Sequence, residues 1–179
     1  MAGLVLRQVE SEGSWNMYAA RTEVFAEGTS PRGAVSLTRG PGIGGNPEEI
    51  ANGAECWTVF LRGSPRIVLP RLCTPWYYSR WSLARGVDGE LDGVPFRLSG
   101  HSALRPSRRA VVVEGAGIDV RIIQRAFSPV LIEQDEQVGL WRSTGWELLE
   151  ASDLAVMAAC LFEWTGAMHF IQTPVIRQL

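Results

Sequence analysis

The sequence predicts a mainly β domain closed by one apolar C-terminal helix. Between residues 4 and 142, short apolar runs recur with period two and are separated by Gly, Pro, Asn and Asp. This alternation is typical of strands joined by turns. After residue 152 it gives way to a continuous apolar run. A chain of 179 residues has the length of one domain. We therefore expect a single domain over residues 1–179, with its strands in 4–142 and its helix at 152–166.

Eleven segments fit a strand pattern. In residues 33–38, Val35 and Leu37 alternate with smaller or polar residues, as in a strand with one buried face. Residues 109–124 predict a hairpin, because two β-branched runs flank the sequence Gly-Ala-Gly at 115–117. The eleven predicted strands cover residues 4–9, 15–25, 33–38, 56–62, 66–72, 76–84, 94–98, 109–114, 118–124, 129–133 and 137–142.

The stretch 39–55 has no apolar period, and four of residues 40–45 are glycine. It predicts a mobile loop. Its first part, RGPGIGGN at 39–46, could offer backbone N–H groups to a phosphate. Because it has neither the GxGxxG spacing nor a clear helix after it, a flexible connection is the preferred interpretation.

The C-terminal helix has clear start and stop signals. Ser152 is a good N-cap, Asp153 places a negative charge in the first turn, and Gly166 is a natural stop. Residues 154–162 are apolar on every side, so the helix must be buried nearly all round. A membrane span would need about 20 apolar residues, whereas this run ends at Glu163, so we do not expect a transmembrane protein.

A helix that is apolar on every side must be surrounded by other elements of the fold. Its length of roughly 20 Å matches the height of a barrel of tilted strands, and barrels of about eleven strands can hold a central helix. The sequence therefore predicts an antiparallel β-barrel of about eleven or twelve strands that encloses the helix. A β-sandwich with the helix packed on one open face is the alternative.

Three segments carry a resemblance to a known family: RRAVVV at 108–113, IDV at 118–120 and SDLAVMAACLF at 152–162. Many strands followed by one apolar helix resemble the tubby-like and phospholipid-scramblase-like barrels. The resemblance implies a closed barrel of about twelve strands around a C-terminal helix. The binding of phosphoinositides through basic surface residues is not carried over, because this lysine-free sequence cannot be aligned to those positions.

Composition excludes several classes of protein. All 17 basic residues are arginine, which excludes a P-loop lysine and Schiff-base chemistry. The formal charge of −2 does not indicate a nucleic-acid partner.

The three cysteines are too few and too widely spaced for a disulfide framework or a paired zinc site. The N-terminus lacks a signal-peptide pattern, so we expect a cytoplasmic protein with reduced thiols.

The candidate ligand-binding residues are Trp76, Tyr78, Arg80 and Trp81, in the segment WYYSRW. A strand would place aromatic rings on both of its faces around the arginine. Such platforms stack sugars, bases or quaternary amines. Aromatic residues are also good strand formers, so packing within the core is the competing interpretation.

Other polar motifs have simpler explanations. The acids of DGELDG at 88–93 resemble the start of a calcium-binding EF-hand loop. The twelfth position of that loop should be a bidentate glutamate, but here it is Ser99, so a hairpin turn with solvated acids is the preferred interpretation. With only His101 and His169 available, we expect no metal site and no cofactor. A catalytic pair of Cys73 with His101 stays open, although buried cysteines usually serve only in packing.

These observations favour a non-catalytic binding or adaptor barrel for a partner protein, lipid or small molecule. One alternative is a cofactor-independent enzyme or carrier with an aromatic-lined barrel cavity. The other is a structural or assembly subunit, which an exposed apolar patch repeated by symmetry would favour.

Overall fold

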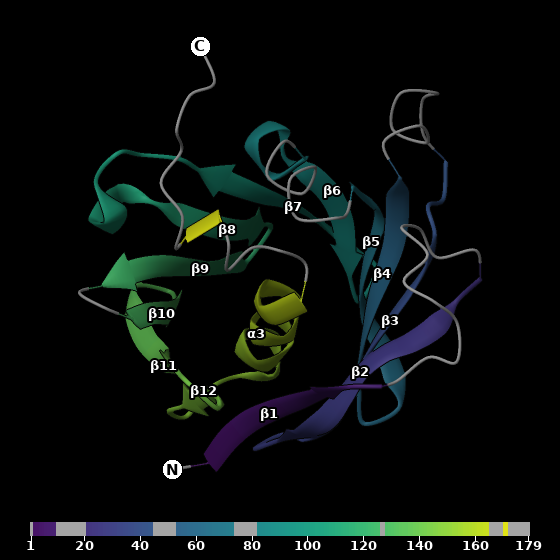
Figure 1. Cartoon of the computed structure of the whole chain (residues 1–179), viewed down its shortest axis with the longest axis horizontal. Helices are drawn as coiled ribbons and strands as arrows, with labels where there is room; N and C mark the ends of the chain where they lie inside the picture. The colour runs from purple at the N-terminus through teal and green to yellow at the C-terminus, as the bar shows by residue number, and fades with distance from the viewer. Residues whose placement is uncertain are drawn as a thin grey trace.

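The chain forms a closed antiparallel β-barrel of twelve strands around one helix, as predicted (Figure 1). The computed structural model describes residues 2–9, 21–44, 53–73, 82–125, 128–164 and 170–171. The strands are β1 (Ala2–Gln8), β2 (Glu23–Ser30), β3 (Gly33–Pro41), β4 (Ala54–Leu61), β5 (Ser64–Cys73), β6 (Val87–Leu91), β7 (Val94–His101), β8 (Ala110–Gly115), β9 (Ile118–Arg125), β10 (Ser128–Glu133), β11 (Glu136–Arg142) and β12 (Gly145–Leu148).

Each strand pairs with its neighbour in the sequence, and one further pairing closes the ring. Strand β1 pairs with β2 through residues 5–8 and with β12 through residues 2–4. The closing register places Ala2 opposite Leu148 and Leu4 opposite Trp146. A closed barrel needs no protected edge strand, because every strand has a neighbour on both sides.

Side chains alternate between the interior and the outer wall, as the period-two pattern requires. In β4 the buried positions are every second residue, from Glu55 and Trp57 to Val59 and Leu61. The predicted hairpin at 109–124 is confirmed: β8 and β9 are in register from Ala110 opposite Ile123 to Gly115 opposite Ile118. The side chains that point into the barrel form one apolar core.

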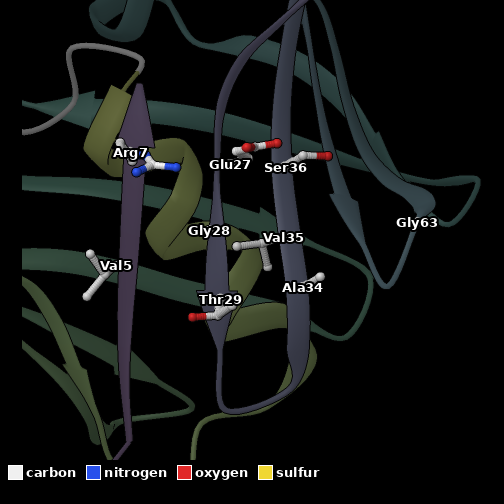
Figure 2. A pocket seen from close by; sticks show the side chains of 9 residues that line it. All are labelled: Val5, Arg7, Glu27, Gly28, Thr29, Ala34, Val35, Ser36 and Gly63. Carbon is white, nitrogen blue, oxygen red and sulfur yellow. The ribbon is translucent and has the colours of Figure 1, made fainter. Parts of the chain in front are cut away.

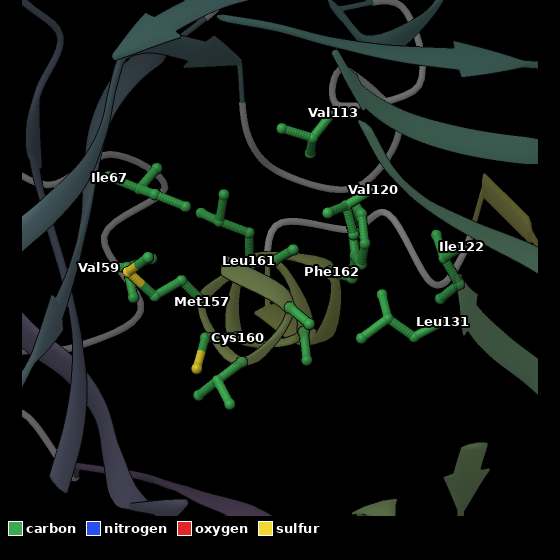
Figure 3. Packing of buried hydrophobic residues seen from close by; sticks show 14 of the residues in the cluster. Val59, Ile67, Val113, Val120, Ile122, Leu131, Met157, Cys160, Leu161 and Phe162 are labelled. Carbon is green, nitrogen blue, oxygen red and sulfur yellow. The ribbon is translucent and has the colours of Figure 1, made fainter. Parts of the chain in front are cut away.

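Helix α3 (Asp153–Trp164) lies in the centre of that core. The backbone N–H of Ala155 donates a hydrogen bond to Ser152 Oγ (3.0 Å), which confirms Ser152 as the N-cap. Every residue from Ala155 to Phe162 is at most 1% exposed, so the helix is buried all round. Figure 3 shows Met157 beside Val59 on one side of the helix, with Phe162 turned toward the opposite wall.

The two ends of the barrel differ in their connections. At the turn end, five hairpins close with two residues each, at 31–32, 62–63, 92–93, 116–117 and 134–135. Both residues of the 62–63, 92–93 and 134–135 turns have positive φ, as the tightest hairpin turns require. At the loop end, the longer connections 9–22, 42–53, 74–86 and 102–109 join the strands. α3 begins at the turn end and runs toward the loop end.

Several predicted boundaries were wrong. Residues 39–41 and 54–55 lie in strands rather than in the predicted 39–55 loop, because β3 and β4 stay paired as far as Pro41 opposite Glu55. The predicted strand at 76–84 is helical over residues 82–84, and its residues 76–81 lie outside the described residues. Of the predicted strand at 15–25, only residues 21–25 are described, and there β2 begins at Glu23 and continues to Ser30. Strands β6 and β12 were not predicted.

Candidate functional site

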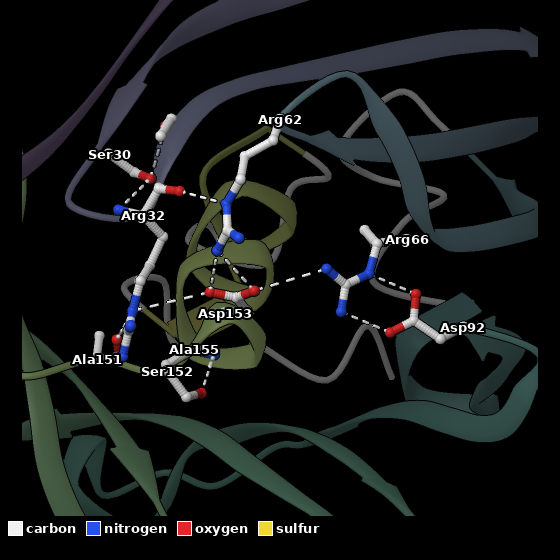
Figure 4. A network of polar contacts seen from close by, with 10 residues as sticks. Ser30, Arg32, Arg62, Arg66, Asp92, Ala151, Ser152, Asp153 and Ala155 are labelled. Atoms are coloured by element: carbon white, nitrogen blue, oxygen red, sulfur yellow. Dashed lines mark hydrogen bonds and ion pairs between the residues drawn. The ribbon is translucent and has the colours of Figure 1, made fainter.

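The turn end is closed by a charged cluster around Asp153, at the start of α3 (Figure 4). Arg62, in the β4–β5 turn, donates two hydrogen bonds to the Asp153 carboxylate, at 2.8 and 2.9 Å. Arg66 of β5 reaches the same carboxylate at 3.6 Å and also binds Asp92. Arg32, in the β2–β3 turn, lies 3.8 Å from it and donates to the carbonyl of Ala151. The cluster ties the β2–β3 turn and the β4–β5 hairpin to the helix.

At the loop end, the buried Arg109 ties the β7–β8 connection to the C-terminal segment. Its guanidinium donates hydrogen bonds to the carbonyls of Ala103 (2.9 Å), Leu104 (3.1 Å) and Ile171 (3.1 Å). Arg109 itself is only 3% exposed. A buried guanidinium is costly unless it is hydrogen-bonded, so these carbonyls fix the backbone around it.

Phe170 fills the interior next to β7. A Cβ on Gly100 would lie 2.7 to 3.0 Å from three atoms of the Phe170 ring, so only glycine leaves room for that ring. Phe170 is 2% exposed and Ile171 is completely buried. Phe170 and Ile171 therefore pack into the barrel on the β7–β8 side, where Ile171 also accepts from Arg109.

Two large apolar side chains are strongly exposed at the loop end: Leu104 at 84% and Ile43 at 64%. Both stand on backbone that is held by hydrogen bonds, because the Leu104 carbonyl accepts from Arg109 and the Ile43 N–H donates to the Pro70 carbonyl (2.9 Å). The side chains of Arg105 and Arg108, in the same connection as Leu104, are exposed too. The loop end thus presents apolar and basic groups together.

A charged group also lies inside the wall near this end. Arg39 of β3 donates to Glu23 of β2 at 2.9 Å and lies 4.0 Å from the buried Glu55 of β4. Its guanidinium carbon sits 4.8 Å from the centre of the Phe25 ring. These contacts tie β2, β3 and β4 together where the barrel opens toward the long connections.

Among the described residues, two hollows on the outer wall stand out. The larger, about 620 Å³, lies over β1, β2 and β3 and is shallow (Figure 2). Val5 and Ala34 contribute apolar surface to it, and Arg7 and Glu27 contribute one charge of each sign. The smaller, about 100 Å³, lies between β5 and β6 and is lined by Arg71, Cys73, Ser82, Arg85, Gly86, Val87 and Asp88. Neither set of residues was singled out as a binding site from the sequence.

The predicted ligand-binding residues Trp76, Tyr78, Arg80 and Trp81 lie outside the described residues, so the structure does not place them. Cys73 and His101, the catalytic pair left open above, lie at the ends of two different strands, β5 and β7, with β6 between them. Cys73 is buried, and its backbone N–H donates to Ser82 Oγ, whereas His101 is exposed. Of the turn predicted at 88–93, only residues 92–93 form a turn, because Asp88 and Glu90 lie in strand β6 of the β6–β7 hairpin.

Burial shifts the pKa values of two cysteines and one glutamate. Burial raises the pKa of the Cys56 and Cys160 thiols, which keeps both protonated and weakly nucleophilic at neutral pH. Burial raises the pKa of Glu163, near the end of α3, to about 7. Oε2 of Glu163 is buried and has no hydrogen-bond partner in the described part of the chain.

Within the described ranges, no three His, Cys, Asp or Glu side chains are grouped closely enough to bind a metal ion. No helix among those residues combines the length and apolar character needed to cross a membrane. Comparisons of the chain with protein families, with curated proteins and with solved structures found no match.

Proposed function

We propose that this chain is a non-catalytic binding barrel in which the wall and α3 form a rigid scaffold and a partner protein binds at the loop end. The observation that carries the proposal is the pair of exposed side chains Ile43 and Leu104, each on a backbone fixed by hydrogen bonds. Exposed apolar groups mark interaction surfaces when they act together rather than singly, and the proposal is that Ile43 and Leu104 act together in this way. They also lose little conformational entropy when they bind.

The charge of this surface suggests the chemistry of the partner. Arg105 and Arg108 are exposed in the same connection as Leu104, and arginine is enriched in protein interfaces. A partner that offers acidic groups around an apolar patch would match them in charge and polarity. The turn end has shorter connections, and Arg32, Arg62 and Arg66 there are already engaged around Asp153.

The alternatives have less support. A carrier or enzyme with an internal cavity needs space inside the barrel, and that interior is occupied by residues 155–162 of α3, each at most 1% exposed. An assembly subunit could use the same exposed side chains to bind a second copy of the chain, and the experiment below separates that outcome from the proposal.

The test compares matched substitutions at the two ends. The Ile43→Ser/Leu104→Ser variant changes the loop end, and Val94→Ser changes an exposed apolar residue beside the 92–93 turn. Capture from a cell extract, followed by titration of the purified partner, should show binding by the wild type and by Val94→Ser. We expect binding to fall at least tenfold in the double variant, since truncating interface anchors typically costs more than about 1.4 kcal/mol.

Three results would count against the proposal. Equal loss of binding in both variants would remove the role of the loop end. Self-association of the purified chain that Ile43→Ser/Leu104→Ser abolishes would indicate an assembly subunit. A stoichiometric small molecule retained in native mass spectrometry would indicate a carrier.

We also propose kinship with the tubby-like and scramblase-like barrels, and a cytoplasmic location. The twelve-stranded wall around a C-terminal helix is the arrangement that the resemblance implies. Cys56, Cys73 and Cys160 form no disulfide with one another, which supports a reducing compartment.

A further inference from the structure

The larger hollow on the outer wall, of about 620 Å³, lies over β1, β2 and β3 (Figure 2). Small residues, among them Gly28, Ala34 and Ser36, line much of it. A Cβ on Gly28 would overlap the carbonyl oxygen of Val5, so glycine allows β1 to lie close to β2. Because the three strands are paired in the sheet, the hollow belongs to the wall and not to a loop.

Val5 projects from the wall beside this hollow and is 55% exposed. In the register of β1 and β2 it lies opposite Thr29, and Figure 2 shows the two side chains at one level of the wall. A single exposed valine does not mark an interface. Here, however, the same patch carries both a protruding apolar side chain and a depression that would receive such a side chain from another molecule.

The patch also carries one charge of each sign. Arg7 of β1 lies directly opposite Glu27 of β2, and both side chains are exposed. Figure 2 shows the Glu27 carboxylate directed toward Ser36 of β3 and away from Arg7. Within the described part of the chain, neither Arg7 nor Glu27 forms an ion pair or a side-chain hydrogen bond. Both charges are therefore available to a second molecule.

A patch with these features is complementary to a copy of itself. A two-fold axis parallel to the strands, between β1 and β2, would place Arg7 of each copy against Glu27 of the other. The same rotation would place Val5 of each copy against Thr29 and the hollow of the other. Such contacts are isologous, so the assembly closes after two copies. The patch thus matches a second copy in both charge and shape.

We propose that the outer face of β1, β2 and β3 binds a second copy of this chain and forms a two-fold symmetric dimer. The 9 residues that line the hollow are fewer than the roughly 20–30 per side of a standard interface. Exposed ion pairs also stabilise a complex only slightly. We therefore expect a weak dimer, with a dissociation constant of about 0.1 mM that rises with salt concentration. The inference goes beyond the proposed function, because it uses the outer wall rather than Ile43 and Leu104.

The experiment is sedimentation equilibrium of the purified full chain at concentrations from about 0.01 to 1 mM, which bracket the expected dissociation constant. The average mass should rise with concentration from that of one chain toward that of two. Added NaCl should lower it, because salt screens the exposed charges.

Exchange of the two charges assigns the dimer to this face. Arg7→Glu and Glu27→Arg each replace two attractive contacts of the dimer by two repulsive ones, so each should weaken self-association at least tenfold. The double variant Arg7→Glu/Glu27→Arg has opposite charges across the axis again and should dimerise. An equimolar mixture of the two single variants should form a mixed dimer, because one carries only acidic and the other only basic groups there.

Two controls separate this face from other surfaces. Arg125→Glu makes the same change of charge at an exposed arginine of β9 that binds Gln137, and it should leave the dissociation constant unchanged. Ile43→Ser/Leu104→Ser should also leave it unchanged, because both residues lie at the loop end.

Several results would overturn the inference. One is a wild-type chain that stays monomeric up to about 1 mM. Another is a dimer that persists in both single variants, or a mixture of those variants that does not associate. Equal weakening in Arg125→Glu would show an unspecific effect of net charge. None of these results bears on the loop-end proposal, which is tested with different residues and a different partner.

Discussion

Replacing Leu161 by alanine tests whether α3 is the centre of the core. Leu161 is completely buried, and Figure 3 shows it on the side of the helix that faces Ile67. Truncating a buried leucine removes its transfer free energy and leaves a cavity, at a cost of about 2–5 kcal/mol. For a domain of this size, a loss of about 3 kcal/mol lowers Tm by roughly 6–12 °C.

The same helix offers a matched control. Leu154 is only partly buried, at the start of α3, and Leu154→Ala makes the same chemical change. Alanine is at least as good a helix former as leucine, so helix propensity does not separate the two variants. We expect Leu154→Ala to cost about 1 kcal/mol, because less apolar area is buried there.

The assay is urea denaturation of both variants, followed by intrinsic fluorescence and by circular dichroism. The midpoint should fall much further for Leu161→Ala, with an unchanged dependence of free energy on urea concentration. Equal losses in the two variants would place α3 at the surface, and the threaded-helix architecture would then be wrong.

Two further predictions concern the loop end. Because the pKa of Glu163 is raised to about 7 from its ordinary 4.5, the folded state holds a proton that the unfolded state releases, so this carboxyl lowers stability as pH rises from 4.5 to 7. Glu163→Gln should therefore raise Tm at pH 8 more than at pH 4.5, and an equal effect at both pH values would refute the assignment. Gly100→Ala should displace the Phe170 ring, so limited proteolysis should cleave the C-terminal segment faster than in the wild type, and Gly100→Ala/Phe170→Leu should restore resistance. Unchanged proteolysis in Gly100→Ala would mean that Phe170 does not depend on that contact.

Where local signals were strong, the sequence predicted the fold well. The alternation in residues 109–124 and the Ser152 cap are properties of short segments, and both were confirmed. Strand β12 has only four residues, too few for a period to appear. Strand β6, with the sequence VDGEL, was interpreted as part of a turn because its acids and glycine are typical of turns. Pairing with neighbouring strands overrides these local preferences.

The candidate sites could not be predicted in the same way. Arg32, Arg62 and Arg66 meet Asp153 only because the barrel brings the β2–β3 and β4–β5 hairpins to the start of α3. Arg71 and Arg85 line one hollow because β5 and β6 separate after two paired positions. Both arrangements depend on register, which a single sequence does not specify. The strand predicted at 76–84 was also extended too far, because aromatic residues with high β propensity precede SLAR, which is helical.

The order of elements along the chain has a consequence for biosynthesis. α3 is translated after all twelve strands, yet it fills the interior that the strands enclose. When β1 to β12 have left the ribosome but α3 has not, the apolar side chains that will face the barrel interior are still exposed. The ring also cannot close before β12 is made, because β1 pairs with β12. Transiently exposed apolar strands are prone to aggregate, so folding after synthesis of the helix, with chaperone protection until then, is the route that this architecture favours.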